Sequence, residues 1–109
     1  RAELDADADA DATADLLVNV TPIGMTGGAE SEEQSFADPA IAAAFVVWDV
    51  VAMPSETPLI RAARAAGKRV ITGAEVITIQ ALEQFVLYTG VRPGDELVAE
   101  ASAFSRACD

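Results

Sequence analysis

Three short, largely apolar runs place the tightest limit on what this chain can fold into. They occupy residues 16–20, 45–51 and 69–72, and β-branched residues occur in all three. A strand exposed on one face alternates apolar and polar residues; these runs do not, so both of their faces are expected to be buried. Helical patterns at residues 39–44, 57–66, 75–89 and from 93 onward separate or follow the runs. This order predicts an α/β fold with a parallel sheet and right-handed crossovers.

Three such strands amount to half of a doubly wound dinucleotide-binding domain. We therefore predict a parallel-sheet, Rossmann-like half-domain with helices on both faces, plus C-terminal closing helices. The glycine-rich phosphate turn, GxGxxG, is absent from the sequence, and its nearest approach at residues 24–28 leads into an acidic loop. We divide the chain into an acidic linker or frayed segment (1–14), the C-terminal part of the Rossmann-like domain (15–90) and a C-terminal helix (91–109). A low-complexity start without Met leads us to expect a piece of a longer protein.

Residues 72–85 are the first candidate for a ligand site. Thr72 and Glu75 have the spacing of a capping box, and Gly73 stands where the backbone turns and a ligand could come close. The following helix is apolar on nearly every side, so we expect it to be buried between two layers. Gln80 is the single uncharged amide in its first two turns. A turn at a strand's carboxyl end, followed by such a helix, is a usual place for a bound ligand.

Other residues of the helix ends follow simple rules. Asp38 and Thr57 each precede a proline, which predicts an N-cap followed by the first helical position. The helix from Thr57 should turn four residues inward: Leu59, Ile60, Ala63 and Ala66. Gly67 and Gly90 are expected to end their helices.

The charge distribution excludes several classes of partner. The formal net charge is −11, and ten of the eighteen acidic residues lie in residues 1–38. Nucleic-acid binding and anionic membrane surfaces require a basic face, which the chain lacks. There is no run long enough to span a membrane and no signal-peptide pattern, so we predict a cytoplasmic protein without membrane or nucleic-acid partners.

Metal and thiol chemistry are also disfavoured. The chain has no histidine, and its single cysteine, Cys108, can form no internal disulfide. The alternating aspartates at residues 5–11 suggest calcium binding as an alternative to a solvated linker. However, an EF-hand loop requires a glycine at its sixth position and a glutamate at its twelfth, and neither is present. We expect no metal site and an unreactive Cys108.

Three segments resemble the shikimate dehydrogenase family. Residues 15–25, DLLVNVTPIGM, resemble the family's DLLINATPLGM, and residues 49–59, DVVAMPSETPL, resemble D-x-x-Y-x-P-x-x-T-P-L. Residues 72–85 followed by Gly90 resemble D-G-x-x-M-L-x-x-Q-A-x-x-x-F and a glycine. The resemblance covers roughly residues 15–106. It implies a two-domain oxidoreductase in which a substrate domain, carrying a Lys–Asp catalytic pair, precedes a Rossmann-like domain that binds NADP, with NAD as the other candidate. The catalytic residues would then lie outside this chain.

The resemblance assigns ligand contacts to five positions. Val50 would meet the nicotinamide carboxamide through its backbone, and Gly73 through its carbonyl. Thr21 would lie in the loop beside the cofactor, and Val76 would replace the family's Met against the nicotinamide ring. Gln80 matches a substrate-binding glutamine, whose amide can donate to and accept from a ring hydroxyl.

Three departures from the family's motifs bear on the substrate. Ala52 replaces a tyrosine that contacts the substrate carboxylate, Thr72 replaces an Asp, and Glu75 replaces a Gly. The resemblance implies hydride transfer between nicotinamide and a cyclic hydroxy or keto acid of the aromatic amino acid (chorismate) pathway, shikimate/3-dehydroshikimate or quinate-like. The alternative is a non-catalytic or altered-substrate paralogue that serves as a binding or regulatory protein. The whole protein would be a monomer or homodimer, and this chain alone would be inactive.

Several residues also have a purely structural interpretation. Gln80 would be a buried amide satisfied by local backbone, and Gly73 a turn glycine. We expect a structural or capping role for Asp49 rather than a catalytic one. Lys68 follows a helix-ending glycine, where a cation suits the helix C-terminus, and Trp48 belongs to the core.

Overall fold

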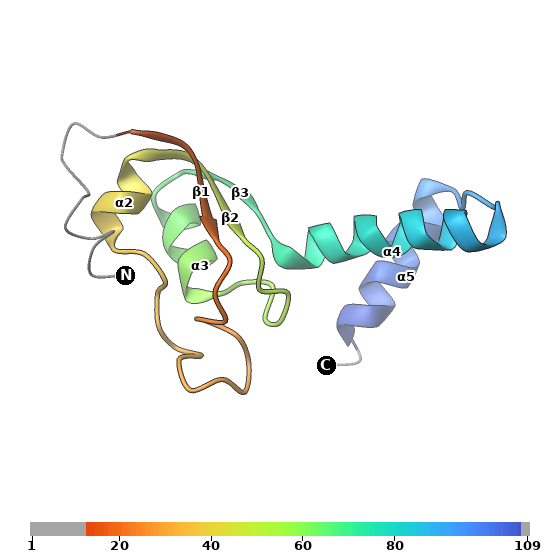
Figure 1. Ribbon diagram of the computed structural model, residues 1–109, viewed down its shortest axis with the longest axis horizontal. Coiled ribbons are helices and arrows are strands. Elements are labelled where there is room, and N and C mark those ends of the chain that lie inside the picture. Colours follow the sequence, from red (N-terminus) through yellow and green to blue (C-terminus); the bar gives the residue numbers. More distant parts are fainter. Residues whose placement is uncertain (1–12, 108–109) are drawn as a thin grey trace. The chain divides into compact units, whose positions relative to one another are not determined.

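The computed structural model describes residues 13–107, which belong to two compact units divided between Ala74 and Glu75 (Figure 1). Most of the predicted acidic segment 1–14, including its alternating aspartates, lies outside the described residues, as does Cys108. The predicted division at residues 14 and 90 therefore stays a prediction, and the observed boundary between units falls after Ala74.

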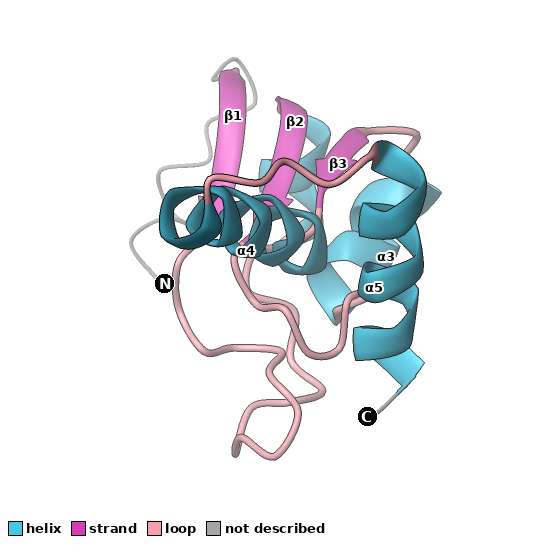
Figure 2. Cartoon of the chain, turned by 90° about the vertical axis from the view of Figure 1, so that its right-hand side faces the viewer, coloured by secondary structure: helices cyan, strands magenta, loops and turns pink. Residues whose placement is uncertain are grey.

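The first unit contains a parallel sheet of three strands in the order β1-β2-β3 (Figure 2). The strands are β1 (Ala14–Asn19), β2 (Ala44–Asp49) and β3 (Arg69–Ile71). Leu17 is paired with Val47, and Val47 with Val70, so apolar side chains lie in register across the sheet. The predicted parallel α/β class is confirmed, with the first two strands beginning and ending slightly earlier than expected.

Two helices, α2 (Asp38–Ala42) and α3 (Pro58–Ala65), pack against this sheet. They contact each other as well as β2, and a single apolar core joins them to the strands; its buried members are Phe36, Ile41, Ala44, Val47, Leu59 and Ala63. Because Val47 belongs to the same cluster as both helices, α2 and α3 cover the same face of the sheet. Among the described residues of this unit, helices cover that one face rather than both, because the helix expected next belongs almost entirely to the second unit.

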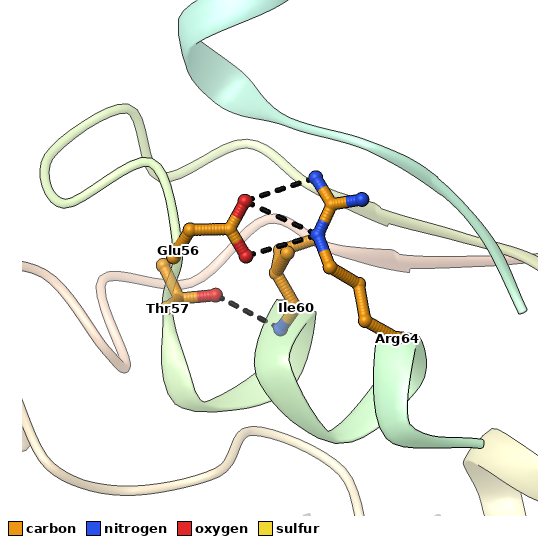
Figure 3. A network of polar contacts seen from close by, with 4 residues as sticks. All are labelled: Glu56, Thr57, Ile60 and Arg64. Carbon is orange, nitrogen blue, oxygen red and sulfur yellow. Dashed lines mark hydrogen bonds and ion pairs between the residues drawn. The ribbon is translucent and has the colours of Figure 1, made fainter. Parts of the chain in front are cut away.

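The ends of α3 follow the sequence rules closely (Figure 3). Thr57 is the N-cap, and its hydroxyl accepts a hydrogen bond from the amide of Ile60 at 3.2 Å. Glu56 and Arg64 form a bidentate ion pair with a shortest distance of 2.9 Å, on an exposed surface. At the other end, Gly67 has a φ of +74°, the left-handed conformation typical of a helix stop.

Two predictions about helix ends are wrong. Asp38 does not cap α2: the N-cap is Ala37, without a side-chain hydrogen bond, and Asp38 Oδ1 instead accepts from the side-chain Nε2 of Gln34 at 2.8 Å. Ala66 is exposed, unlike Leu59, Ile60 and Ala63, because α3 ends at Ala65 and Ala66 already turns away in the C-cap.

The second unit is formed by α4 (Gly73–Thr89), whose first two residues belong to the first unit, and α5 (Asp95–Ala107). Gly90 ends α4 with a φ of +70°, and its amide donates to the Val86 carbonyl at 2.8 Å. The α5 helix starts two residues later than the expected position 93. Thr78 and Ser102 connect the two helices through their hydroxyl oxygens, which are 2.9 Å apart.

The predicted burial of the α4 helix is wrong for this chain. Five of its large apolar side chains are about half or more exposed: Ile77 52%, Ile79 60%, Phe85 47%, Leu87 82% and Tyr88 86%. Apolar residues surround the helix on all sides, and within its unit the only other helix among the described residues is α5, which itself has no buried residue. One neighbouring helix cannot cover a helix that is apolar on every side.

Candidate functional site

The candidate site begins where the strands of the first unit end. Thr21, Val50 and Gly73 all follow the carboxyl ends of strands, at positions two, one and two residues beyond β1, β2 and β3. Parallel strands end at the same edge of their sheet, so the three residues share that edge. The structure therefore brings together the three predicted contacts that lie in the first unit.

A fully buried carboxylate organises this edge. Asp49, at the end of β2, is 0% exposed, and its oxygens accept three hydrogen bonds. The side-chain amide of Asn19 donates to Oδ1 at 3.1 Å, and the backbone amide of Val51 donates to the same oxygen at 2.9 Å. The Thr57 hydroxyl donates to Oδ2 at 2.7 Å. Burying a carboxylate is costly unless donors surround it, and here donors from three segments do so. These bonds agree with the expected structural role of Asp49.

Asn19, at the end of β1, is the second centre of the network and is 1% exposed. Its Oδ1 accepts from both the amide and the hydroxyl of Thr21, at 3.0 Å and 2.6 Å. Its Nδ2 donates to the Ile23 carbonyl at 3.2 Å as well as to Asp49. Asn19 therefore fixes the loop after β1 and joins it to the end of β2.

The loop after β2 is held from both sides. The backbone amide of Val50 donates to the Asn19 carbonyl at 3.0 Å, so this amide is already used. A ligand contact through the Val50 backbone would have to use the carbonyl. Further along, the amide of Thr26 donates to the Met53 carbonyl at 2.8 Å and connects the two loops. Ala52, the residue that departs from the expected tyrosine, lies half-buried between these points.

Gly73 packs directly against the Val50–Val51 backbone. A methyl group at Gly73 would lie 2.5 Å from the Val50 carbonyl oxygen and equally close to the Val51 carbonyl carbon, and closer still to the Val51 oxygen. No side chain fits such a gap. Gly73 is thus required by an approach of backbone to backbone, which accounts for this glycine whether or not a ligand comes close to it as well.

The other two predicted contacts lie on α4, in the second unit. Val76 is half-buried and Gln80 is exposed, so the expected alternative of Gln80 as a buried amide is wrong for this chain. The two residues are four positions apart and therefore share one face of the helix. The Thr72–Glu75 capping box is a prediction that the structure leaves open.

An apolar groove of about 410 Å³ separates α4 from α5 within the second unit. Eleven residues line it: Ile77, Thr78, Ala81, Leu82, Phe85, Pro93, Leu97, Val98, Ala101, Ser102 and Ser105. On α5, Leu97 and Ala101 line the groove, whereas Phe104 lies outside it and is 71% exposed. The lining carries hydroxyls but no charged group, so it offers packing surface rather than acid–base chemistry.

Charged groups elsewhere have structural partners. Lys68 donates to the Ala42 carbonyl at 2.9 Å, at the C-terminus of α2, as expected of a cation that suits a helix end. Arg92 forms a bidentate pair with Glu83 at 3.1 Å, and this hydrogen bonding and charge lower the pKa of the Glu83 carboxyl. Within residues 13–107, no three Cys, Asp or Glu side chains gather where they could hold a metal ion. None of the described helices is long and apolar enough to cross a membrane.

Comparison with known proteins gives a consistent result, although no family model matches the chain. A shikimate dehydrogenase-like protein of Haemophilus influenzae is 60% identical over 93 residues, which are 85% of this chain and 34% of that protein. A shikimate dehydrogenase (NADP(+)) of Leptospira interrogans is 32% identical over 95 residues, 86% of this chain and 32% of that protein. The chain is homologous to proteins of the shikimate dehydrogenase family. It spans about a third of the length of these relatives.

Solved structures show the same relationship. A shikimate 5-dehydrogenase-like protein is similar with a TM-score of 0.83 and 58% identity, over 88% of this chain and 36% of that one. Quinate dehydrogenase from Corynebacterium glutamicum, in complex with NAD, has a TM-score of 0.69 and 35% identity, over 84% of this chain and 31% of its own. The Rossmann-like character of the first unit is thereby confirmed.

Sequence reasoning missed one residue of this edge, Asn19, and, away from the edge, the second role of the α3 N-cap Thr57. A signal for Asn19 exists: it is the one polar residue inside the run 16–20. A polar residue at the end of a buried strand requires hydrogen-bond partners, and a search for them would have pointed to Asp49 at the matching position of the next strand. Nothing in the sequence indicates that the N-cap threonine also donates to that carboxylate.

Proposed function

We propose that this chain is part of an NADP-dependent oxidoreductase that acts on a cyclic hydroxy acid or its keto form, shikimate/3-dehydroshikimate or a quinate-like acid. The observation that carries the proposal is the meeting of Thr21, Val50 and Gly73 at the carboxyl edge of a parallel sheet. Ligands of open α/β sheets bind at that edge. Of the proteins named above, one is a shikimate dehydrogenase (NADP(+)) and one is a quinate dehydrogenase solved with NAD; NADP is our choice and NAD the alternative.

The residues of this edge suit the amide end of a nicotinamide. The carbonyls of Val50 and Gly73 belong to segments in backbone contact, and a carboxamide group has two N–H donors to offer them. Thr21 is held in place by Asn19 and would form the wall beside them. When bound, the dinucleotide would supply hydride transfer at the nicotinamide ring. On α4, Val76 would pack against the ring and Gln80 would bind the substrate.

The chain would contribute positioning rather than proton transfer. It has no histidine, and Asp49 is enclosed by three donors, which leaves it no role as a base. We assign the proton transfer to a Lys–Asp pair in a substrate domain outside this chain. That domain is also our candidate for covering the exposed apolar residues of α4, because relatives are about three times as long as the matched segment.

The direct test measures NADP⁺ and NAD⁺ reduction by the whole protein, with shikimate and quinate as separate substrates. We expect turnover of at least one acid, with the absorbance of the reduced cofactor at 340 nm as the readout. Calorimetry gives cofactor affinity independently. Absence of turnover with both acids, together with absence of cofactor binding, would exclude the enzyme.

The second candidate is an altered-substrate or non-catalytic paralogue, and Ala52 is the observation that favours it. A methyl group cannot hydrogen-bond a substrate carboxylate, whereas the tyrosine expected there could. Ala52→Tyr should therefore lower KM for shikimate, by roughly tenfold or more for a hydrogen bond to a charged group, and leave KM for the cofactor unchanged. If cofactor binds but neither wild type nor A52Y turns over either acid, the paralogue interpretation is favoured.

A further inference from the structure

The buried pair Asn19–Asp49 does not belong to the apolar core of the first unit. The shared core of the first unit is already formed by apolar residues of the sheet, α2 and α3. Asp49 and Asn19 instead occupy the strand ends, where they are 0% and 1% exposed. Replacement of both partners of a buried hydrogen bond by apolar groups of the same shape can be nearly neutral or stabilising, so stability alone is a weak reason to bury a carboxylate here.

The hydrogen-bond partners of the pair lie in the loops that follow β1 and β2. Asn19 holds Thr21 through its side chain and the Val50 amide through its carbonyl, while Asp49 holds the Val51 amide. The Val50–Val51 backbone is in turn the surface against which Gly73 packs. The loops after β1 and β2 are thereby tied to Asn19 and Asp49, whose side chains are joined to each other at 3.1 Å, and the loop after β3 packs against the second of these loops.

We propose that Asp49 is a positioning residue: with Asn19, it fixes the Val50–Val51 carbonyls relative to Thr21 so that the nicotinamide edge is rigid before the cofactor binds. This inference rests on the proposed function of the edge. Asp49 touches neither cofactor nor substrate and acts through the backbone it holds. Its loss should therefore affect cofactor binding and hydride transfer rather than substrate affinity.

The chemistry requires a carboxylate at this position. An ionised carboxylate is an acceptor only, and all three neighbours of Asp49 are donors. In Asp49→Asn, which has nearly the same shape, one side of the group becomes a donor. If the NH₂ group faces Thr57, the hydroxyl must accept a second hydrogen bond and leaves its own proton unpaired. If it faces the other way, it opposes Asn19 Nδ2 and the Val51 amide.

The test compares D49N with a matched control, Thr57→Val, in the whole protein. T57V also removes a hydrogen bond from Asp49, but it leaves the bonds to Val51 and Asn19 in place. Both variants are assayed at a temperature where urea unfolding shows each to be folded. We expect D49N to raise KM for NADP⁺ and lower kcat by at least roughly tenfold, since a misplacement of about 1 Å can cost 10²-fold. KM for the acid substrate should change less than twofold in both variants, and T57V should keep the wild-type KM for NADP⁺.

Equal cofactor KM values in folded D49N and T57V would overturn the inference while leaving the proposed function intact. A wild-type protein that binds neither NADP⁺ nor NAD⁺ would overturn both. If D49N does not fold, amide hydrogen exchange of the wild type decides. The inference then requires the amides of Thr21, Val50 and Val51 to exchange slowly together in the cofactor-free protein. Fast exchange that becomes slow only when NADP⁺ is added contradicts it.

Discussion

Replacing Gly73 with alanine separates two physical effects that act in opposite directions. Gly73 is the first residue of α4, and its φ is not in the left-handed range, so alanine can adopt its backbone conformation. Helix propensity alone favours alanine by about 1 kcal/mol. The added methyl group, however, would lie 2.5 Å from the Val50 carbonyl oxygen, about 1 Å inside the usual separation of roughly 3.5 Å.

The steric effect should win because the opposing atoms cannot move freely. They are backbone atoms, and the Val50 and Val51 amides are anchored to Asn19 and Asp49 at 3.0 Å and 2.9 Å. Overpacking of this kind costs about 1–3 kcal/mol. We expect a cost of about 3 kcal/mol here, because the opposing backbone is fixed and cannot move away from the added methyl group. Subtracting the propensity term leaves a net loss of about 2 kcal/mol. With an m-value of about 2 kcal/mol/M, the urea midpoint should fall by about 1 M.

Gly94→Ala is the matched control for this experiment. Gly94 has no atom within 4 Å of the position of an added methyl group and no positive φ. Its substitution should change the free energy of unfolding by less than about 0.5 kcal/mol, or stabilise slightly by restricting the unfolded chain. A G73A protein whose urea midpoint equals or exceeds the wild-type value would refute the claim that backbone contact dictates this glycine.

Three further measurements examine the cap, the ion pair and the exposed helix. Thr57→Ala should lower the free energy of unfolding in urea by about 2–3 kcal/mol, since it removes an N-cap and one donor of a buried carboxylate. Its control, Thr26→Ala at an exposed position, should lower that free energy by less than about 0.5 kcal/mol. Arg92→Gln should raise the pKa of Glu83 in an NMR titration, and Arg106→Gln should leave it unchanged. Pairing with Arg92 lowers the pKa of Glu83 in the folded state. The stability that the pair contributes is therefore present above the pKa of Glu83 in the unfolded chain and is lost as the pH falls below about 4, and R92Q should not show this pH-dependent loss of stability. Leu87→Ala should destabilise the whole protein by about 2 kcal/mol if another domain covers α4, and by less than about 0.5 if Leu87 stays 82% exposed.

The sequence predicted the elements of the first unit well because each had a local cause. Apolar runs marked the strands, Thr57 and Pro58 marked the start of α3, and Gly67 marked its end. Asp38 failed as a cap because a nearby side chain, Gln34, offered a competing hydrogen bond. That competition depends on how the loop folds back, and a local rule does not contain it.

The candidate site was only partly predictable for a similar reason. The positions of Thr21, Val50 and Gly73 at strand ends follow from the element order alone. The bond that joins the two loops to each other does not, since Asn19 and Asp49 are 30 positions apart in the chain. A polar residue in an apolar run indicates that a hydrogen-bond partner exists, but the register of the sheet determines which residue that partner is. Here the register pairs Asn19 with Asp49 directly.

The α4 helix shows why burial could not be inferred from apolarity. A helix that is apolar on every side requires cover on every side, and that requirement is a property of the sequence. The sequence of the helix does not show what covers it, because the cover can come from the same unit, another domain or another chain. In this chain the described residues supply α5 and a groove of about 410 Å³, and leave Leu87 and Tyr88 more than four-fifths exposed. The second unit therefore has too little buried apolar surface to hold its own shape firmly. If Gln80 binds substrate, the partner that covers α4 must also fix the position of that side chain, so completing the fold and completing the substrate site would be one event.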